Sequence, residues 1–201
     1  RTVDGDVARE LLGLDSDDFV YLFFGSIRRY KQVPELVEAF RDAHLDERSR
    51  LVVCGSPRTD VLQQRIETAI GDDERIVFSR GHVPDELVQI YFRAADVVVL
   101  PFERILTSGS AVLAMSFAKP TVVPAIDALL DMVGADHCTS YNPDRLGALG
   151  EALERVRQNR DALEEMGKAS RERARKWDWE TVAEMTDQVY RRAANRLTSV
   201  Q

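Results

Sequence analysis

The chain has 201 residues, 44% of them hydrophobic and 30% charged, which is typical of a globular protein that can build its core without disulfide or metal staples. Its formal charge of −7 and pI of about 5.1 argue against a general binder of nucleic acid or acidic membrane surfaces. Cys54 and Cys138 form no C-x-x-C pair, and no apolar run approaches the roughly 20 residues of a membrane span. These features predict a reduced, cytoplasmic protein.

Residues 1–18 are polar and are predicted to be a linker before the first strand. Asp15 and Asp17 in this segment have a D-x-D spacing, and a carboxylate pair can hold a divalent ion. Carboxylates also gather in solvated turns that precede strands. We favour the turn, and we expect no metal site here.

A wholly apolar run over 19–24 predicts a strand that is covered on both faces. It ends in the loop "GSIRRYK", and a helix with Pro34 in its first turn follows. The loop cations include Arg28 and Lys31, and they lie where ligands bind in open α/β folds, at the carboxyl end of a strand. We expect them to contact phosphate.

Short apolar runs then alternate with helical stretches of 10–15 residues, which indicates βαβ units. The fold class predicted is α/β, a doubly wound and mainly parallel six-stranded sheet with C-terminal helices. Residues 19–176 are expected to form this Rossmann-like domain, and 177–201 a terminal helix. The later predicted strands are "RLVVCG", "RIVFS", "DVVVL", "PTVVP" and "HCTSY".

The segment 100–120 carries the strongest local signal for a ligand. A strand end is followed by the polar run Thr107-Ser108-Gly109-Ser110 and then by "AVLAMSFA", which is rich in helix formers. The N–H groups that begin a helix lack intrahelical partners, and the helix dipole is positive there, so this arrangement suits an anion. The alternative is that Thr107 or Ser108 serves only as an N-cap.

Two nucleotide-binding fingerprints are absent from the sequence. The first strand is followed neither by G-x-G-x-x-G nor by a P-loop, and the three histidines have no metal-ligand spacing. What remains is a set of cationic and hydroxyl-rich loops at one sheet edge. That set suits a nucleotide diphosphate held by Arg, Lys and a helix dipole without a metal ion.

The order of landmarks along the chain resembles a known family. These landmarks are "FFGSIRRYKQVPELVEAF", "LVVCGS", "IVFSRGHVPDELVQIYFRAADVVVLP", "LTSGSAVLAMSFAKPTVVP" and "WDWETVAEMTDQVY". Together they resemble the C-terminal, nucleotide-sugar-binding domain of glycosyltransferase family 4 (glycosyl transferases group 1), which has the GT-B fold. The resemblance covers nearly the whole chain.

The resemblance implies specific contacts to a nucleoside-diphosphate sugar. Its basic pair on the donor diphosphate corresponds to Arg28 and Lys31, although the family's Arg usually follows the glycine directly, where this chain has Ser26. Gly81-His82-Val83 corresponds to the loop that meets the nucleobase. The substrate-binding residues so predicted are Gly25, Ser26, Arg28, Lys31, His82, Val83, Arg104, Leu106, Thr107, Ser108, Gly109 and Ser110.

The chain departs from the family at its glutamate signature. The two glutamates, one on the donor sugar and one on the ribose, correspond to Ile105 and Leu113 here, and Glu103 is out of register. The usual glycine pair is replaced around 126–127. A subset of similar sequences has Arg-x-Leu-Thr-Ser-Gly, which "RILTSG" from Arg104 matches. Diphosphate binding therefore survives the comparison better than sugar recognition does.

The resemblance also predicts the wider setting. It implies a donor-binding half of a glycosyltransferase of polysaccharide or glycoconjugate synthesis, using a UDP- or GDP-sugar and no cofactor. The acceptor-binding N-terminal domain is missing, so we expect an inactive fragment whose helix 177–201 packs on that domain. The chain starts at Arg1 without methionine, which fits a piece of a longer protein. We expect that protein to be cytoplasmic or peripheral at the inner face of the membrane, with no nucleic-acid partner.

Two alternatives remain open at this point. The first is a binding or scaffold protein that kept the fold and lost catalysis, which the residues at the two glutamate positions favour. The second is a GT-B-like sugar-nucleotide epimerase, but the carboxylates and histidines that such an enzyme needs are not evident.

Overall fold

A computed structural model describes residues 3–105, 107–177 and 179–198. Six strands form one sheet in the order β3-β2-β1-β4-β5-β6, and every neighbouring pair is parallel. The predicted doubly wound sheet is confirmed, and it is parallel throughout. The strands are β1 (Phe19–Phe24), β2 (Ser49–Gly55), β3 (Ile76–Arg80), β4 (Val97–Val99), β5 (Thr121–Pro124) and β6 (Cys138–Tyr141).

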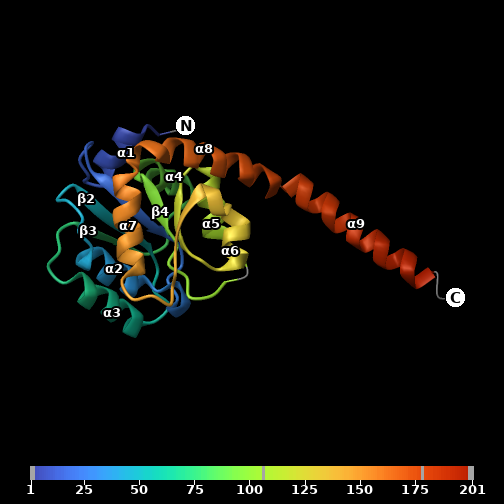
Figure 1. The fold of residues 1–201 in the computed structure, drawn as a ribbon, viewed down its shortest axis with the longest axis horizontal. Helices are drawn as coiled ribbons and strands as arrows, with labels where there is room; N and C mark the ends of the chain where they lie inside the picture. Colours follow the sequence, from blue (N-terminus) through green and yellow to red (C-terminus); the bar gives the residue numbers. More distant parts are fainter. Residues whose placement is uncertain (1–2, 106, 178, 199–201) are drawn as a thin grey trace.

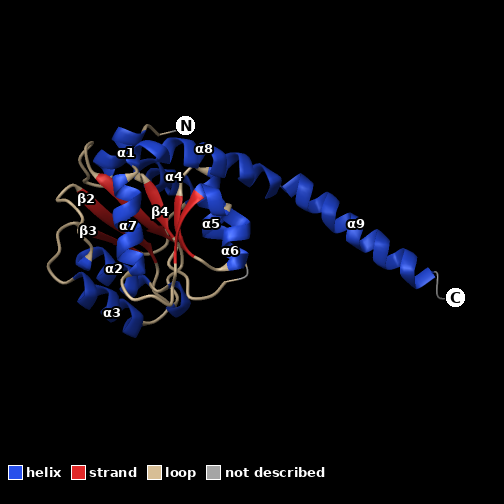
Figure 2. Cartoon of the chain, viewed as in Figure 1, coloured by secondary structure: helices blue, strands red, loops and turns tan. Residues whose placement is uncertain are grey.

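Helices cover both faces of the sheet, and one long helix projects away from it (Figures 1 and 2). In the described residues the α-helices are α1 (Gly5–Leu11), α2 (Val33–Asp42), α3 (Asp60–Ile70), α4 (Asp85–Ala94), α5 (Gly109–Ser116), α6 (Asp127–Val133), α7 (Ala148–Gln158), α8 (Leu163–Ala174) and α9 (Trp179–Thr198). The described residues also contain four short 3-10 helices: η1 (Arg29–Lys31), η2 (Ala135–His137), η3 (Arg160–Ala162) and η4 (Arg175–Trp177).

The strand order determines which helices share a face. From β1 the chain winds outward through α2 and α3 to β3, and it then crosses back through α4 to β4. Right-handed crossovers that run in opposite directions place their helices on opposite faces. Accordingly α2 packs beside α3 and α7 on one face, whereas α1 packs on α4, and α5 on α8. The winding reverses between β1 and β4, so a crevice is expected at their carboxyl ends.

The central strand β1 packs against the helices on both faces of the sheet. All six of its residues are apolar or aromatic and nearly all are buried, because helices cover both sides of it. Phe19, Tyr21 and Phe40 of α2 form a chain of edge-on aromatic contacts. The buried hydroxyl of Tyr21 donates a hydrogen bond to the carbonyl of Leu153 in α7, at 2.9 Å, so its polar group is satisfied.

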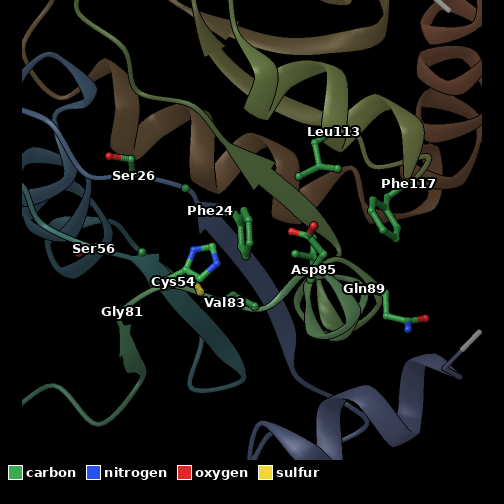
Figure 3. Close-up of a pocket in the computed structure, with 14 residues that line it drawn as sticks. Phe24, Ser26, Cys54, Ser56, Gly81, Val83, Asp85, Gln89, Leu113 and Phe117 are labelled. Atoms are coloured by element: carbon green, nitrogen blue, oxygen red, sulfur yellow. The ribbon is translucent and has the colours of Figure 1, made fainter. Parts of the chain in front are cut away.

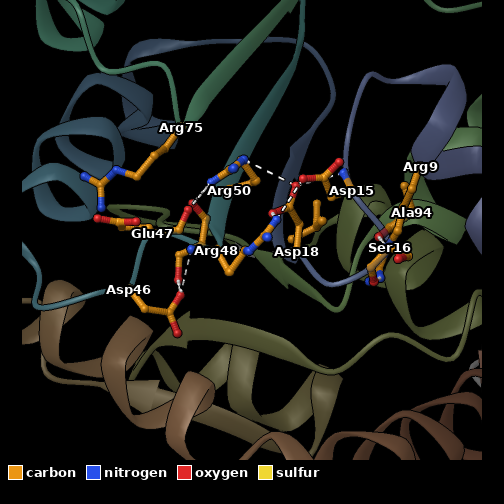
Figure 4. A network of polar contacts seen from close by, with 12 residues as sticks. Arg9, Asp15, Ser16, Asp18, Asp46, Glu47, Arg48, Arg50, Arg75 and Ala94 are labelled. Atoms are coloured by element: carbon orange, nitrogen blue, oxygen red, sulfur yellow. Dashed lines mark hydrogen bonds and ion pairs between the residues drawn. The ribbon is translucent and has the colours of Figure 1, made fainter.

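Acidic and basic side chains gather near the start of β1 and β2 (Figure 4). Asp18 is buried, and its carboxylate lies 3.3 Å from the guanidinium of Arg50. It also accepts a hydrogen bond from the backbone N–H of Asp15, at 2.9 Å. The carboxylate of Asp15 pairs with Arg48 at 2.8 Å. The first carboxylate of the D-x-D segment therefore belongs to a turn that leads into a strand.

Asp96, just before β4, links α1 to the sheet. Its carboxylate accepts the backbone N–H of Val20 at 2.8 Å and pairs with Arg9 of α1 at 2.9 Å. Arg9 also donates to the carbonyl of Ala94 at 3.1 Å. The two side chains are only 18% and 12% exposed, so the interaction is poorly screened by water.

We predict that Asp96→Ala destabilises the chain by about 3 kcal/mol, because it leaves the Arg9 charge and the Val20 N–H without their partner. The measurement is urea unfolding followed by circular dichroism. Asp15→Ala is the control: its pair with Arg48 is largely exposed, so the midpoint should hardly move. Equal shifts for the two variants would contradict this assignment.

None of the helices in the described part of the chain combines the length and the apolar character that a membrane span requires. The two cysteines form no disulfide.

Candidate functional site

A hollow of about 530 Å³ opens at the carboxyl edge of β1, β2 and β3, between the start of α4 and the side of α5 that carries Leu113 and Phe117 (Figure 3). Its walls are mostly apolar, with serine, aspartate, glutamine and histidine side chains among them. This composition suits a small ligand with a flat ring and a few polar atoms. The lining residues are Phe24, Gly25, Ser26, Cys54, Gly55, Ser56, Gly81, His82, Val83, Asp85, Val88, Gln89, Leu113 and Phe117.

The start of α5 lies at one end of this hollow. Ser108 is buried and is the N-cap residue, and its hydroxyl accepts a hydrogen bond from the backbone N–H of Ala111 at 3.1 Å. Its side chain is thereby committed to the helix, as the N-cap alternative predicted. Gly109 and Ser110 are the first two helical residues, and N–H groups at these positions lack intrahelical acceptors. The helix start therefore still offers N–H groups to a ligand.

Lys31, at the end of η1, is a buried cation with no counter-charge. Its side chain is 8% exposed, and its ammonium lies 5.9 and 5.5 Å from the ring centres of Phe23 and Phe102. No carboxylate pairs with it in the part of the chain that the structure describes. Burial lowers the pKa of Lys31, and the neighbouring Arg28 lowers it further. An anionic ligand would offset both the desolvation of the ammonium and its repulsion by Arg28.

The cation and the helix start meet at Gly25. A methyl group added to Gly25 would lie 3.1 Å from the Ser110 hydroxyl oxygen and 3.5 Å from the Lys31 ammonium. The φ angle of Gly25 is +127°, a conformation that residues with a side chain rarely adopt. The β1–α2 loop and the start of α5 are thus adjacent, with bare backbone between the two donors. A diphosphate could approach closely at this point.

The other predicted residues are distributed unevenly around the site. Ser26, His82 and Val83 line the hollow together with Gly25. Arg28 is exposed and lines a separate pocket, although it is close enough to lower the pKa of Lys31.

In the loop before α5 the predicted residues are more dispersed. Thr107 is exposed, and Arg104 points into solvent with only a long 3.8 Å pairing to Glu103. Leu106 lies outside the described residues. The loop therefore contributes to the site mainly through its last residues, at the start of α5.

Sequence reasoning missed a polar pair, Ser79 and Tyr91, that adjoins the lining residue Cys54. The Ser79 hydroxyl lies 2.7 Å from the Tyr91 hydroxyl, and burial raises the pKa of the nearby Cys54 thiol to about 11. The thiol is therefore neutral at physiological pH and is not a nucleophile. Ser56 was also missed, although its place just after β2 matches that of Ser26 after β1. The lining residues of α4 and α5 carry no such positional signal, because they depend on how those helices pack.

Comparison with known proteins identifies the family of the chain. The family model for glycosyl transferases group 1 matches residues 5–173. The chain belongs to this family. Its resemblance to that family is thereby confirmed, while the finer assignment to glycosyltransferase family 4 stays a prediction.

Curated relatives match the chain over alignments of different length. A GDP-mannose:glycolipid 4-beta-D-mannosyltransferase of Xanthomonas campestris pv. campestris is 35% identical over 116 residues, which are 56% of this chain and 33% of that protein. A D-inositol 3-phosphate glycosyltransferase of Streptomyces griseus is 30% identical over 197 residues, covering 91% of this chain and 41% of the relative. The chain thus spans between about a third and a half of these curated relatives.

Solved structures confirm the fold as the Rossmann-like half of a GT-B protein. Sucrose-phosphate synthase from Thermosynechococcus elongatus superposes with a TM-score of 0.78 and 25% identity, over 96% of this chain and 50% of that one. The C-terminal domain of a glycosyl transferase group 1 protein from Francisella tularensis superposes with a TM-score of 0.70 and 17% identity, over 86% of this chain and 92% of that domain.

Proposed function

We propose that this glycosyl transferases group 1 chain is the donor-binding half of an enzyme that moves a sugar from a nucleoside-diphosphate sugar to an acceptor. The observation that carries the proposal is the buried, unpaired Lys31 ammonium beside the start of α5, with only the backbone of Gly25 between them. A buried charge without a partner costs stability, so its retention fits a ligand that supplies the missing negative charge. The adjoining apolar hollow has room for the nucleoside.

The chemical task of this half is to stabilise the leaving group. As the bond between sugar and phosphate breaks, negative charge grows on the diphosphate. Lys31, the start of α5 and the charge of nearby Arg28 would meet that charge. A fixed donor of this kind lowers the barrier by about 3–4 kcal/mol in a closed active site.

The chain alone is proposed to bind nucleotide without turnover. Met185 and Val189 of α9 are 60% and 63% exposed, on a helix that projects from the domain (Figure 1). We assign this apolar stripe to packing against an N-terminal, acceptor-binding domain. The whole protein would act in polysaccharide or glycoconjugate synthesis, in the cytoplasm or at the inner face of the membrane, without a metal or other cofactor.

A nucleotide-binding or scaffold protein without transfer activity is the second candidate. Leu113 lines the hollow, and Ile105 is partly buried against the core. These are the two positions that correspond to the glutamates of glycosyltransferase family 4. Neither side chain can bind a sugar hydroxyl or a ribose by hydrogen bonding. This observation favours a protein that kept the donor fold and lost sugar recognition.

Titration calorimetry with UDP, GDP and ADP tests the donor proposal. Binding of at least one of them, with clearly weaker binding of the matching nucleoside, is the expected result. A folded sample that binds no nucleoside diphosphate would favour a scaffold that has lost ligand binding as well as catalysis.

Of the two predicted donor bases, the hollow favours guanine. Asp85 lines it in the first turn of α4, and a carboxylate can accept two N–H groups from a guanine edge but only one from uracil. The mannosyltransferase relative is named for GDP-mannose, in agreement with this choice.

We therefore predict that Asp85→Asn weakens GDP binding about tenfold and leaves UDP binding within about twofold, since a hydrogen bond to a charged group contributes about 1.5–3 kcal/mol. Glu86→Gln is the matched control, because Glu86 shares the first turn of α4 but does not line the hollow. An equal loss of GDP and UDP in Asp85→Asn would count against base reading. Calorimetry measures the affinities of the wild-type chain and of each variant for GDP and for UDP.

A further inference from the structure

A second pocket lies beside the loops that follow β1 and β2. It shares no lining residue with the hollow proposed for the nucleotide. It encloses about 360 Å³, and four arginines line it: Arg28, Arg29, Arg58 and Arg65. The nucleotide hollow is lined by the earlier residues of each loop, such as Ser26 and Ser56. The arginine pocket, as we call the second cavity, is lined by the residues that follow them and by the start of α3.

The backbone holds two of these arginines side by side. Parallel pairing of β1 and β2 continues past the strand ends through an isolated bridge between Ile27 and Pro57. The N–H of Ile27 donates to the carbonyl of Ser56 at 2.9 Å, and the N–H of Arg58 donates to the carbonyl of Ile27 at 3.0 Å. Arg28 and Arg58 each follow a bridge partner directly, so the ladder places two cations next to each other, and Arg29 begins η1.

The positive charge of the pocket is largely uncompensated. Arg65 pairs with Glu35 at 3.0 Å, but Arg28, Arg29 and Arg58 have no carboxylate partner among the described residues. Arginines at the opposite edge of the sheet do have such partners, as Arg48 and Arg50 show. These arginines are exposed, so water screens their mutual repulsion, but together they create a positive potential that favours an anion.

The start of α3 adds to the positive potential. Thr59 caps this helix of 11 residues, and its hydroxyl accepts the N–H of Leu62 at 3.2 Å. Both Thr59 and Leu62 line the arginine pocket, so the positive end of the helix dipole lies beside the three arginines. Helix dipole and guanidinium groups both favour an anion, and guanidinium groups bind phosphate oxygens in a bidentate manner.

We propose that the arginine pocket binds a phosphate or pyrophosphate group of a second ligand, distinct from the donor nucleotide. The proposed diphosphate position beside Gly25 has its own cation, Lys31, so the donor diphosphate does not need Arg29 or Arg58. The two pockets flank the same loops and can be filled together. Resting on the proposed function, the second ligand is a phosphorylated acceptor: its phosphate group binds in the arginine pocket and the rest of it binds the N-terminal domain.

Inorganic pyrophosphate is the probe for this site. The chain is first saturated with GDP, which occupies the donor diphosphate position, and pyrophosphate is then titrated by calorimetry. We expect one further equivalent to bind. The double variant Arg29→Ala/Arg58→Ala should weaken that binding about tenfold or more and leave GDP affinity within about twofold. Arg192→Ala, an exposed arginine on α9, is the control and should change neither.

Absence of pyrophosphate binding to the GDP-saturated chain, or binding that the double variant leaves intact, would overturn the proposal. If GDP itself does not bind, the proposed function fails, yet the arginine pocket is still tested by titrating pyrophosphate into Lys31→Ala. The two failures are therefore distinguishable.

Vesicle sedimentation identifies the source of the phosphate. Phosphatidylcholine vesicles are compared with and without phosphatidic acid, using the wild-type chain and the double variant. Binding that needs both phosphatidic acid and the two arginines assigns the site to a lipid-borne phosphate. Pyrophosphate binding without vesicle binding assigns it to a water-soluble phosphate ester.

Discussion

Replacing Lys31 by methionine should weaken binding of nucleoside diphosphates about 10- to 150-fold and, at the same time, stabilise the unliganded chain. The loss of affinity corresponds to one charge-assisted contact of about 1.5–3 kcal/mol. The gain in stability follows because the ammonium is buried between Phe23 and Phe102 without a counter-charge. Calorimetry with GDP and guanosine, and thermal unfolding without ligand, measure the two effects.

The pH dependence of this effect has a definite sign. Burial lowers the folded-state pKa of Lys31 below its ordinary value of 10.5. Between the two pKa values the unfolded chain binds more protons, so this group makes stability rise as the pH increases through that interval. The stability advantage of Lys31→Met should therefore be largest near neutral pH and shrink in alkali. Diphosphate binding needs the ammonium, so wild-type affinity should fall as the pH rises through the lowered pKa.

Lys119 provides a matched control. It too is a lysine with a pKa lowered by burial, but its ammonium donates to the carbonyl of Ala95 at 2.6 Å. Lys119→Met should destabilise the chain, because it leaves that carbonyl without its partner, and should not alter nucleotide affinity. If Lys31→Met lowers the affinity for guanosine as strongly as the affinity for GDP, or destabilises the chain as Lys119→Met does, the role of Lys31 is structural.

Gly55→Ala is expected to have the largest effect on stability among the changes considered. A methyl group at Gly55 would lie 2.0 Å from the carbonyl oxygen of Gly25, where the ends of β1 and β2 run closely side by side. Because the clash is with backbone, the β1 and β2 loops must separate, which should cost about 3 kcal/mol or more and distort both pockets. Chemical denaturation should show a large fall in midpoint, with loss of GDP binding under conditions where the variant still folds.

Gly13→Ala separates the loss of stability caused by a steric clash from the loss caused by backbone strain. Gly13 also has a positive φ, +70°, but a methyl group there would meet nothing within 4 Å. Its cost should be limited to the strain of a left-handed residue, about 1 kcal/mol. A Gly55→Ala variant no less stable than Gly13→Ala would show that the loops do not approach as closely as described.

Much of the fold was predictable because it depends on local patterns. The apolar run of β1, and the alternation of short strands with helices after it, predict a mainly parallel sheet from the sequence alone. The rule that ligands bind at carboxyl ends of strands then pointed to the loops containing Gly25 and Lys31, and to the start of α5. The structure brings these segments together.

The rest of the site depends on side-chain directions, which sequence patterns do not specify. Arg28 and Lys31 are three residues apart in one irregular loop, yet Arg28 lines the arginine pocket, whereas the Lys31 ammonium is buried beside Gly25. The burial of Lys31 requires Phe102 from another strand end, and only the contact with Ala111 shows that Ser108, rather than Thr107, caps the helix. Such features arise from tertiary packing.

The central claim is that a diphosphate binds between Lys31 and the start of α5. Its most direct test is a titration of the isotope-labelled chain with GDP, followed through backbone amide resonances. We predict that the largest shifts occur at Gly109 and Ser110 and in the loop at Gly25, and that guanosine leaves the amides of Gly109 and Ser110 unmoved. Saturation by GDP without any shift at those amides would contradict the account.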